Sequence, residues 1–81
     1  MSPSNIQQTD KLRNMIMEIT LNSQIIQTEQ TNVNDLIASL NLENPNVVVE
    51  LNLKILKRVN WEQAILHPGD CVEIITFMGG G

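Results

Sequence analysis

The last three residues of the chain, Gly79, Gly80 and Gly81, are the ones best able to carry chemistry. Glycines lack a Cβ atom, so a terminal run of them can enter a channel that is too narrow for side chains. The α-carboxylate of Gly81 is ionised at neutral pH. It is therefore a nucleophile toward an activated phosphate, but it cannot donate its acyl group until it has itself been activated.

ATP could supply this activation. Attack of the Gly81 carboxylate on the α-phosphate would give an acyl adenylate, and a sulfur nucleophile could then displace AMP to leave a thiocarboxylate. The catalytic groups for these steps would belong to other proteins. We therefore expect a carrier and protein co-substrate rather than an enzyme. The alternative is that the glycines are an inert, frayed chain end.

Apolar side chains precede the glycines at the end of the last predicted strand. Side chains alternate between the two faces of a strand, so Val72 and Ile74 would face the core. Ile75 and Phe77 would then point to the opposite face. We expect Ile75, Phe77 and Met78 to form a docking patch for the activating partner. The alternative is that they only cover the edge of a small core.

Cys71 and His67 are expected to have structural roles. Cys71 has no neighbouring histidine or second cysteine to activate it, which favours a buried or half-buried structural thiol. His67 lies in a predicted turn without a companion histidine, so a solvated loop residue fits better than a base or a metal ligand. Paired carboxylates, Gly-rich phosphate loops and metal-ligand spacings do not occur in the sequence. We expect no catalytic residue, no metal and no bound cofactor.

The charge balance and the cysteine count narrow the choice of partner and compartment. Nine acidic and five basic residues give a formal charge of −4, which disfavours nucleic acid and anionic membranes. One cysteine cannot form an intramolecular disulfide, and the chain has no secretory or membrane-spanning apolar run. The cytoplasm fits best, and an organelle stroma is possible.

Three basic residues are expected to solvate an exposed hairpin, with contact to an acidic partner as the alternative: Lys54, Lys57 and Arg58.

A chain of 81 residues allows one domain around one core. Residues 1–14 are polar and without periodicity, which predicts a disordered leader or extension. Residues 15–78 form the predicted domain, and residues 79–81 form a flexible tail. We therefore expect no second domain.

Strand patterns occur in two pairs and one single segment. Asn22 and Ser23 form a two-residue loop between the first pair, and Asn52 and Leu53 form the equivalent loop between the second pair, so each pair is predicted to be an antiparallel hairpin. Alternating or β-branched apolar residues mark the five strands: residues 17–21, 24–27, 47–51, 54–57 and 71–77.

One helix is predicted between the two hairpins. Thr31 or Asn32 can cap its start, and Asn41 can take a left-handed conformation at its end. Pro45 makes continuation of the helix unfavourable. Its apolar residues recur at i, i+3, i+4 and i+7, which is typical of a single core-facing stripe: Val33, Leu36, Ile37 and Leu40.

A short helical turn before the last strand completes the pattern. Asn60 is expected to cap a turn over residues 61–64, with Gln63 completing a capping-box-like pair and Trp61 folded onto the sheet. The order is then strand, strand, helix, strand, strand, short turn, strand. This order predicts an α+β protein with a β-grasp (ubiquitin-like) fold, in which one main helix packs across one face of a mixed sheet of about five strands.

With these elements in place, residues 15–81 resemble the ThiS family of thiamine-pathway sulfur carriers. Four segments carry the resemblance when they are taken in order. They are VVVELN at residues 47–52, WEQ at residues 61–63, PGD at residues 68–70 and EIITFMGGG at residues 73–81. Two departures are the lack of glycine in the loop at Asn52 and Leu53 and the additional leader before Met15.

The resemblance implies how the carrier would work. An E1-like adenylyltransferase similar to ThiF would activate Gly81 with ATP, and a cysteine desulfurase relay would supply the sulfur. Gly81 would carry the thiocarboxylate, and Gly79 and Gly80 would thread into the partners. A thiazole synthase similar to ThiG would accept the sulfur.

Three other functions remain open at this point. A MoaD-like carrier for molybdopterin synthesis shares the fold and the Gly-Gly end, although it typically has a proline-containing segment where Thr76, Phe77 and Met78 stand here. A ubiquitin-like modifier would share the activation step but form covalent adducts with target lysines. A plain β-grasp interaction module would have an inert tail.

Overall fold

The computed structural model describes residues 16–42 and 46–76. The predicted leader at residues 1–14 and the glycine tail at residues 79–81 lie outside the described residues. So do Met15, Pro45, Phe77 and Met78.

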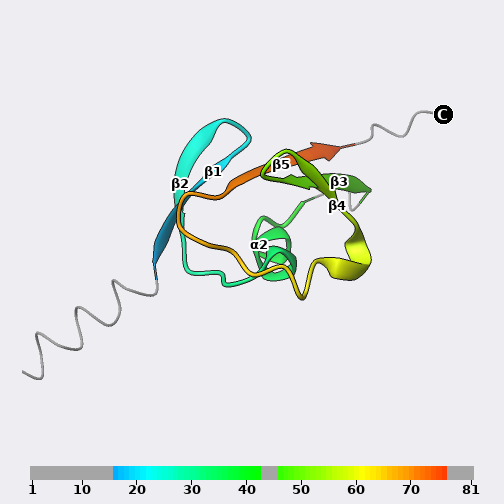
Figure 1. Ribbon diagram of the computed structural model, residues 1–81, viewed down its shortest axis with the longest axis horizontal. Coiled ribbons are helices and arrows are strands. Elements are labelled where there is room, and N and C mark those ends of the chain that lie inside the picture. The colour runs from blue at the N-terminus through cyan, green and yellow to red at the C-terminus, as the bar shows by residue number, and fades with distance from the viewer. Residues whose placement is uncertain (1–15, 43–45, 77–81) are drawn as a thin grey trace, which may run out of the picture.

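Five strands form one mixed sheet with the order β2-β1-β5-β3-β4 (Figure 1). The strand β5 lies in the centre, where it pairs parallel with β1 and antiparallel with β3. Each hairpin adds its second strand at one edge, so β2 and β4 are the edge strands. The elements are β1 (Met17–Leu21), β2 (Gln24–Thr28), α2 (Val33–Ser39), β3 (Val47–Leu51), β4 (Lys54–Leu56), the 3₁₀ helix η1 (Arg58–Asn60) and β5 (Cys71–Thr76). The predicted α+β, β-grasp architecture is confirmed.

Both hairpins turn through two residues with positive φ. The angles are 49° at Asn22 and 69° at Ser23, and 52° at Asn52 and 71° at Leu53. This pattern defines a type I′ turn, whose twist matches that of the strands it joins. Asparagine tolerates the left-handed region because its short polar side chain bonds to nearby backbone. The two predicted loops are therefore confirmed as tight turns.

The helix α2 begins at the second of the two predicted caps. The side-chain oxygen of Asn32 accepts a hydrogen bond from the backbone N–H of Asp35 at 2.7 Å. Val33 and Leu36 are fully buried on the face that meets the sheet. Asn41 has a φ of 54° just after the helix, which confirms the predicted left-handed residue.

Figure 1 shows α2 on one side of the sheet, and the core lies between the helix and that face. Its members come from every layer, so no element can bury its apolar face alone. They are Ile19, Val33, Leu36, Val49, Trp61, Leu66 and Val72. The other face of the sheet carries the alternate residues of each strand and is not covered by the helix.

A 3₁₀ helix that the sequence did not predict precedes the expected short turn. The 3₁₀ helix covers Arg58–Asn60, and the predicted turn follows it over residues 61–63, where the carbonyls of Asn60 and Trp61 accept hydrogen bonds from the N–H groups of Gln63 and Ala64 at 3.2 and 3.4 Å. Trp61 determines this geometry, because its ring is buried and its Nε1 donates a hydrogen bond to the carbonyl of Leu56 at 3.1 Å. The chain must therefore turn immediately after β4. The prediction that Trp61 folds onto the sheet is confirmed.

Candidate functional site

The candidate site is the end of the central strand, from which the glycine tail continues. We call Ile75 and Thr76, the last two residues of β5, the tail root. On one side the tail root pairs with β3, through Val48 opposite Ile75 and Val47 opposite Thr76. On the other side the parallel ladder with β1 reaches only as far as Val72.

Asn22 extends the support of β5 beyond the end of β1. Its backbone N–H donates to the carbonyl of Val72 at 3.0 Å, and its side-chain oxygen accepts from the N–H of Ile74 at 2.8 Å. The amide side chain thus takes the place of the next strand residue. β5 is held on both sides as far as Ile74, directly before the tail root.

Asn52 supports the opposite end of the same strand. Its backbone N–H donates to the carbonyl of Cys71 at 2.7 Å, and its side-chain oxygen accepts from the N–H of Cys71 at 2.9 Å. The Asn52 amide also donates to Asp70 at 3.1 Å. The turn before β5 and the β3–β4 turn are therefore joined, and the central strand is fixed at its beginning as well as near its end.

We call the sheet face opposite to α2 the uncovered face. At this site it presents an apolar pair next to an acidic pair. Ile75 is 43% exposed and lies opposite Val48. The next pair on the same face places Glu50 directly opposite Glu73. The predicted outward orientation of Ile75 is thus confirmed, as is the burial of Val72. Phe77 and Met78, the other two residues of the predicted docking patch, lie outside the described residues.

Cys71 and His67 have the surroundings of structural residues. Cys71 is half-buried at the start of β5, and its backbone is held by Asn52. The side chain of His67 is exposed, and its backbone N–H donates to the Asp70 carboxylate at 2.8 Å. Over residues 16–42 and 46–76, no group of three or more His, Cys, Asp and Glu side chains could hold a metal ion.

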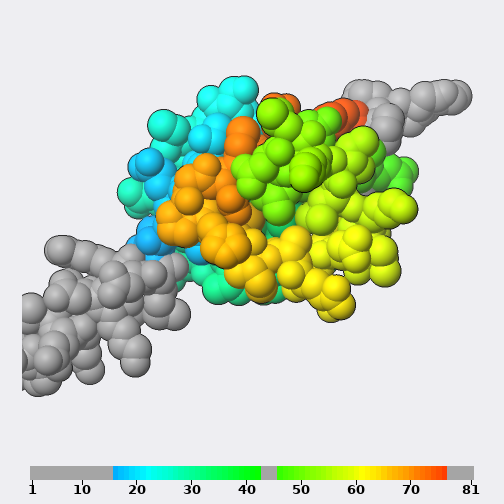
Figure 2. Space-filling view, viewed as in Figure 1, coloured from blue at the N-terminus to red at the C-terminus, as the bar shows by residue number. Residues whose placement is uncertain are grey.

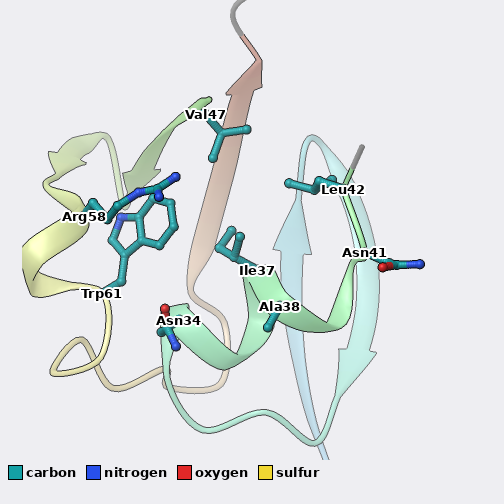
Figure 3. Close-up of a pocket in the computed structure, with 8 residues that line it drawn as sticks. All are labelled: Asn34, Ile37, Ala38, Asn41, Leu42, Val47, Arg58 and Trp61. Carbon is teal, nitrogen blue, oxygen red and sulfur yellow. The ribbon is translucent and has the colours of Figure 1, made fainter. Parts of the chain in front are cut away.

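A shallow groove of about 300 Å³ lies beside α2 (Figure 3). The guanidinium of Arg58 lies 4.8 Å from the ring centroid of Trp61 at its border. Sequence reasoning did not predict this groove, because its walls come from elements that are distant along the chain and no local pattern connects them. The lining residues are Asn34, Ile37, Ala38, Asn41, Leu42, Val47, Arg58 and Trp61.

In the described part of the chain, no helix has both the length and the apolar character needed to cross a membrane.

A five-stranded mixed sheet, one packed helix and a chain end that continues from the central strand define a β-grasp protein of the ubiquitin-like class. The family model described as "ThiS family" matches residues 11–81. The chain belongs to the ThiS family: it is a sulfur carrier protein of thiamine biosynthesis, and such a carrier is non-catalytic. Membership implies that the carrier works through a thiocarboxylate.

Individual relatives agree with this assignment. The chain is 41% identical over 49 residues to the "Sulfur carrier protein ThiS" of Bacillus subtilis, a match that covers 60% of this chain and 74% of the relative. A crystal structure of the thiamine biosynthesis protein (ThiS) from Geobacter metallireducens aligns with a TM-score of 0.70 and 33% identity, over 80% of this chain and 100% of that one.

A third match lies within a longer protein. The chain is 37% identical over 49 residues to a protein of Paramagnetospirillum magneticum named "Thiazole synthase". The aligned part is 60% of this chain but only 15% of that protein. A segment similar to this carrier is therefore part of a much longer chain.

Proposed function

We propose that Gly81 is the group that carries the sulfur. Its carboxylate oxygen attacks the α-phosphate of ATP, pyrophosphate leaves, and an acyl adenylate forms. A sulfur nucleophile equivalent to hydrosulfide then attacks the carbonyl carbon, and the bond to AMP breaks to leave the thiocarboxylate. The observation that carries this proposal is that the match to the ThiS family continues through the three glycines to residue 81.

The proposed partners rest on the resemblance to the ThiS family. An E1-like, ThiF-like adenylyltransferase binds the ATP and activates Gly81, and a cysteine desulfurase relay supplies the sulfur. A ThiG-like thiazole synthase accepts it. The similarity to a segment of a protein named thiazole synthase supports the last partner, because a carrier and its acceptor must come together for the transfer.

The described residues support this function by fixing the place from which the tail extends. Asn22 holds β5 as far as Ile74, and β3 pairs with both residues of the tail root. A partner that binds the domain would therefore find the tail root at a constant position, which reduces the entropy that is lost on docking. Gly79 and Gly80 then thread into the partner site.

Docking would use the uncovered sheet face at the tail root. Ile75 and Val48 offer apolar contact, and we propose that Phe77 and Met78 take part in the same docking contact. The adjacent carboxylates of Glu50 and Glu73 are opposite each other on neighbouring strands, so a basic side chain of the partner would relieve their repulsion. We therefore expect a partner surface that is apolar at its centre and basic beside it.

The compartment that fits these steps is the cytoplasm, or an organelle stroma. ATP is present in both. The single cysteine and its half-buried position at the start of β5 suit a reducing environment.

Mass spectrometry of the intact protein tests the proposal directly. The full chain is incubated with a ThiF-like adenylyltransferase from the same organism, ATP and sodium sulfide, and the product is fragmented in the gas phase. We expect replacement of one oxygen by sulfur, located at Gly81 and dependent on ATP. Location is essential, because oxidation of any of the four methionines adds nearly the same mass.

Two variants serve as controls. Cys71→Ala should still acquire sulfur, since the thiol has no part in the reaction. Deletion of Gly81 should abolish the change and leave the circular dichroism spectrum unaltered. The proposal would be wrong if the sulfur were found at Cys71 or if the deletion variant were still modified.

A further inference from the structure

The two hairpins of the sheet are matched in sequence and in geometry. Residues 21–25 read Leu-Asn-Ser-Gln-Ile, and residues 51–55 read Leu-Asn-Leu-Lys-Ile. In each, a leucine pairs with the residue that follows the type I′ turn. Ile25 and Ile55, each two residues after the turn, are both 70% exposed. Within these five residues the hairpins therefore differ at two positions only, where Leu53 and Lys54 stand in place of Ser23 and Gln24.

Leu53 is unfavourable for the folded chain in two respects. Its φ of 71° lies in the left-handed region, where a Cβ atom crowds the following carbonyl and where this turn position normally has glycine. Its side chain is also 83% exposed, so no burial offsets the strain. Exposed leucines are common on surfaces, but a strained one at a turn tip gives the fold no benefit. A local strain of this kind points to a use of the side chain.

The surroundings of Leu53 differ in charge from the rest of the domain. In the described ranges, every lysine and arginine lies within residues 54–58, and all three of these side chains are exposed. They follow the edge strand β4 and the start of η1. In a chain with a formal charge of −4, this edge is the part that attracts an acidic surface. Figure 2 shows the yellow-green hairpin at the near surface, beside the orange start of β5.

We propose that the tip of the β3–β4 hairpin is a second docking element. Leu53 inserts into an apolar recess on a partner protein, and carboxylates at the rim of this recess meet Lys54. The proposal rests on the proposed function for the identity of the partner, which is an enzyme that acts on the tail. If the partner is a different protein, the same surface would still fit an apolar recess that has carboxylates at its rim.

The position of the tip allows one partner to hold it together with the tail. The tip follows Leu51, which pairs with Val72, whereas the tail root pairs with Val47 and Val48 at the other end of β3. The two ends of this strand are about 13 Å apart at 3.3 Å per residue. A partner of ordinary interface size covers this length. Two separated contacts would also orient the carrier, which a single contact next to the tail could not do.

The matched hairpins provide the test. Isothermal titration calorimetry would measure the affinity of the full chain for the ThiF-like adenylyltransferase and for the ThiG-like thiazole synthase of the same organism. Leu53→Gly removes the side chain and relieves the strain. We expect its Tm to rise by roughly 3–6 °C and its affinity for at least one enzyme to fall about tenfold. Leu53→Asn, which suits the left-handed region without glycine's freedom, should weaken binding as much.

Ser23→Gly is the control for strain. It relieves a left-handed residue at the equivalent position of the β1–β2 turn and removes no apolar side chain. We expect a higher Tm and an unchanged affinity. A general change in the fold would not explain a higher Tm with weaker binding in Leu53→Gly together with a higher Tm and unchanged binding in Ser23→Gly.

A second pair of variants tests the charge. Lys54→Gln and Gln24→Glu each make the chain more negative by one unit at equivalent hairpin positions. We expect Lys54→Gln to weaken binding about threefold and to reduce its dependence on salt, and Gln24→Glu to have no effect.

Several results would overturn the proposal. Unchanged affinity of Leu53→Gly for both enzymes would remove the docking role, and so would equal losses in Leu53→Gly and Ser23→Gly. Self-association of the wild-type chain that Leu53→Gly abolishes would make a second copy the occupant instead. None of these results affects the placement of sulfur at Gly81, which is measured on the wild-type chain by mass spectrometry, so the two proposals can fail separately.

Discussion

Asn22 and Asn52 hold the same strand by the same device. Each is the first residue of a type I′ turn with positive φ, and each side-chain oxygen accepts a hydrogen bond from a backbone N–H of β5. The donors are Ile74 at 2.8 Å for Asn22 and Cys71 at 2.9 Å for Asn52. Glycine could adopt the turn conformation but could not make this bond, because it has no side chain. Both hairpins are thus fastened to the strand that leads to the tail.

The first prediction concerns these two bonds. Asn22→Gly and Asn52→Gly keep a residue suited to positive φ and remove the acceptor, so each should lower the free energy of unfolding by about 1–2 kcal/mol. The loss should be the larger one in Asn52→Gly, which also removes the hydrogen bond to Asp70. Urea denaturation followed by circular dichroism measures the loss. Ser23→Gly in the same turn should not be destabilising. Stability equal to that of the wild type in both asparagine variants would show that water replaces the amide at no cost.

The second prediction separates the docking role of Ile75 from its contribution to the fold. Ile75→Glu places a charge on the uncovered face at the tail root, and we expect a loss of sulfur acquisition at Gly81 of about tenfold or more. Ile25→Glu makes the same change on the edge strand β2, where the side chain is 70% exposed, and should have little effect. The rate of thiocarboxylate formation gives both values. Equal rates for the two variants would exclude a specific contact at Ile75.

The third prediction follows from Glu50 and Glu73. Like charges directly opposite on neighbouring strands repel, so Glu73→Gln should raise the free energy of unfolding by about 0.5 kcal/mol. The gain should shrink in high salt, which screens the repulsion. Glu62→Gln, at an exposed turn residue, is the control for the change in net charge. If the acidic pair meets a basic partner side chain, Glu73→Gln should also weaken partner binding while it stabilises the free carrier.

Local patterns were sufficient to predict most of the fold. Alternation along the predicted strands at residues 17–21 and 71–77 depends only on the two faces of a strand, so it also predicted the burial of Val72 and the exposure of Ile75. The asparagines of the two turns were predicted for the same reason, since positive φ is a local property.

Contacts between distant residues were not predicted. The bond from Ile74 to Asn22 connects residues that share no sequence pattern, and it became visible only when the sheet order was known. The turn after Asn60 was predicted from a local capping pattern, but the 3₁₀ helix before it was missed, because the buried ring of Trp61 determines where the chain turns after β4. The strain at Leu53 was likewise not recognised, although the missing glycine in its loop was the available signal.

The last prediction concerns Trp61, which connects the short turn to the sheet and the core. Its ring is 4% exposed, and its Nε1 donates to the carbonyl of Leu56 at 3.1 Å. Trp61→Phe keeps an aromatic ring but leaves that carbonyl without its partner, so we expect a loss of about 1–2 kcal/mol. Trp61→Ala should lose about 3–5 kcal/mol because it also opens a cavity. Urea denaturation monitored by circular dichroism is the appropriate measurement, since this is the only tryptophan of the chain. Val59→Ala, at a 79% exposed residue of η1, should change little, and a Trp61→Ala variant as stable as Val59→Ala would show that the turn is not part of the folded core.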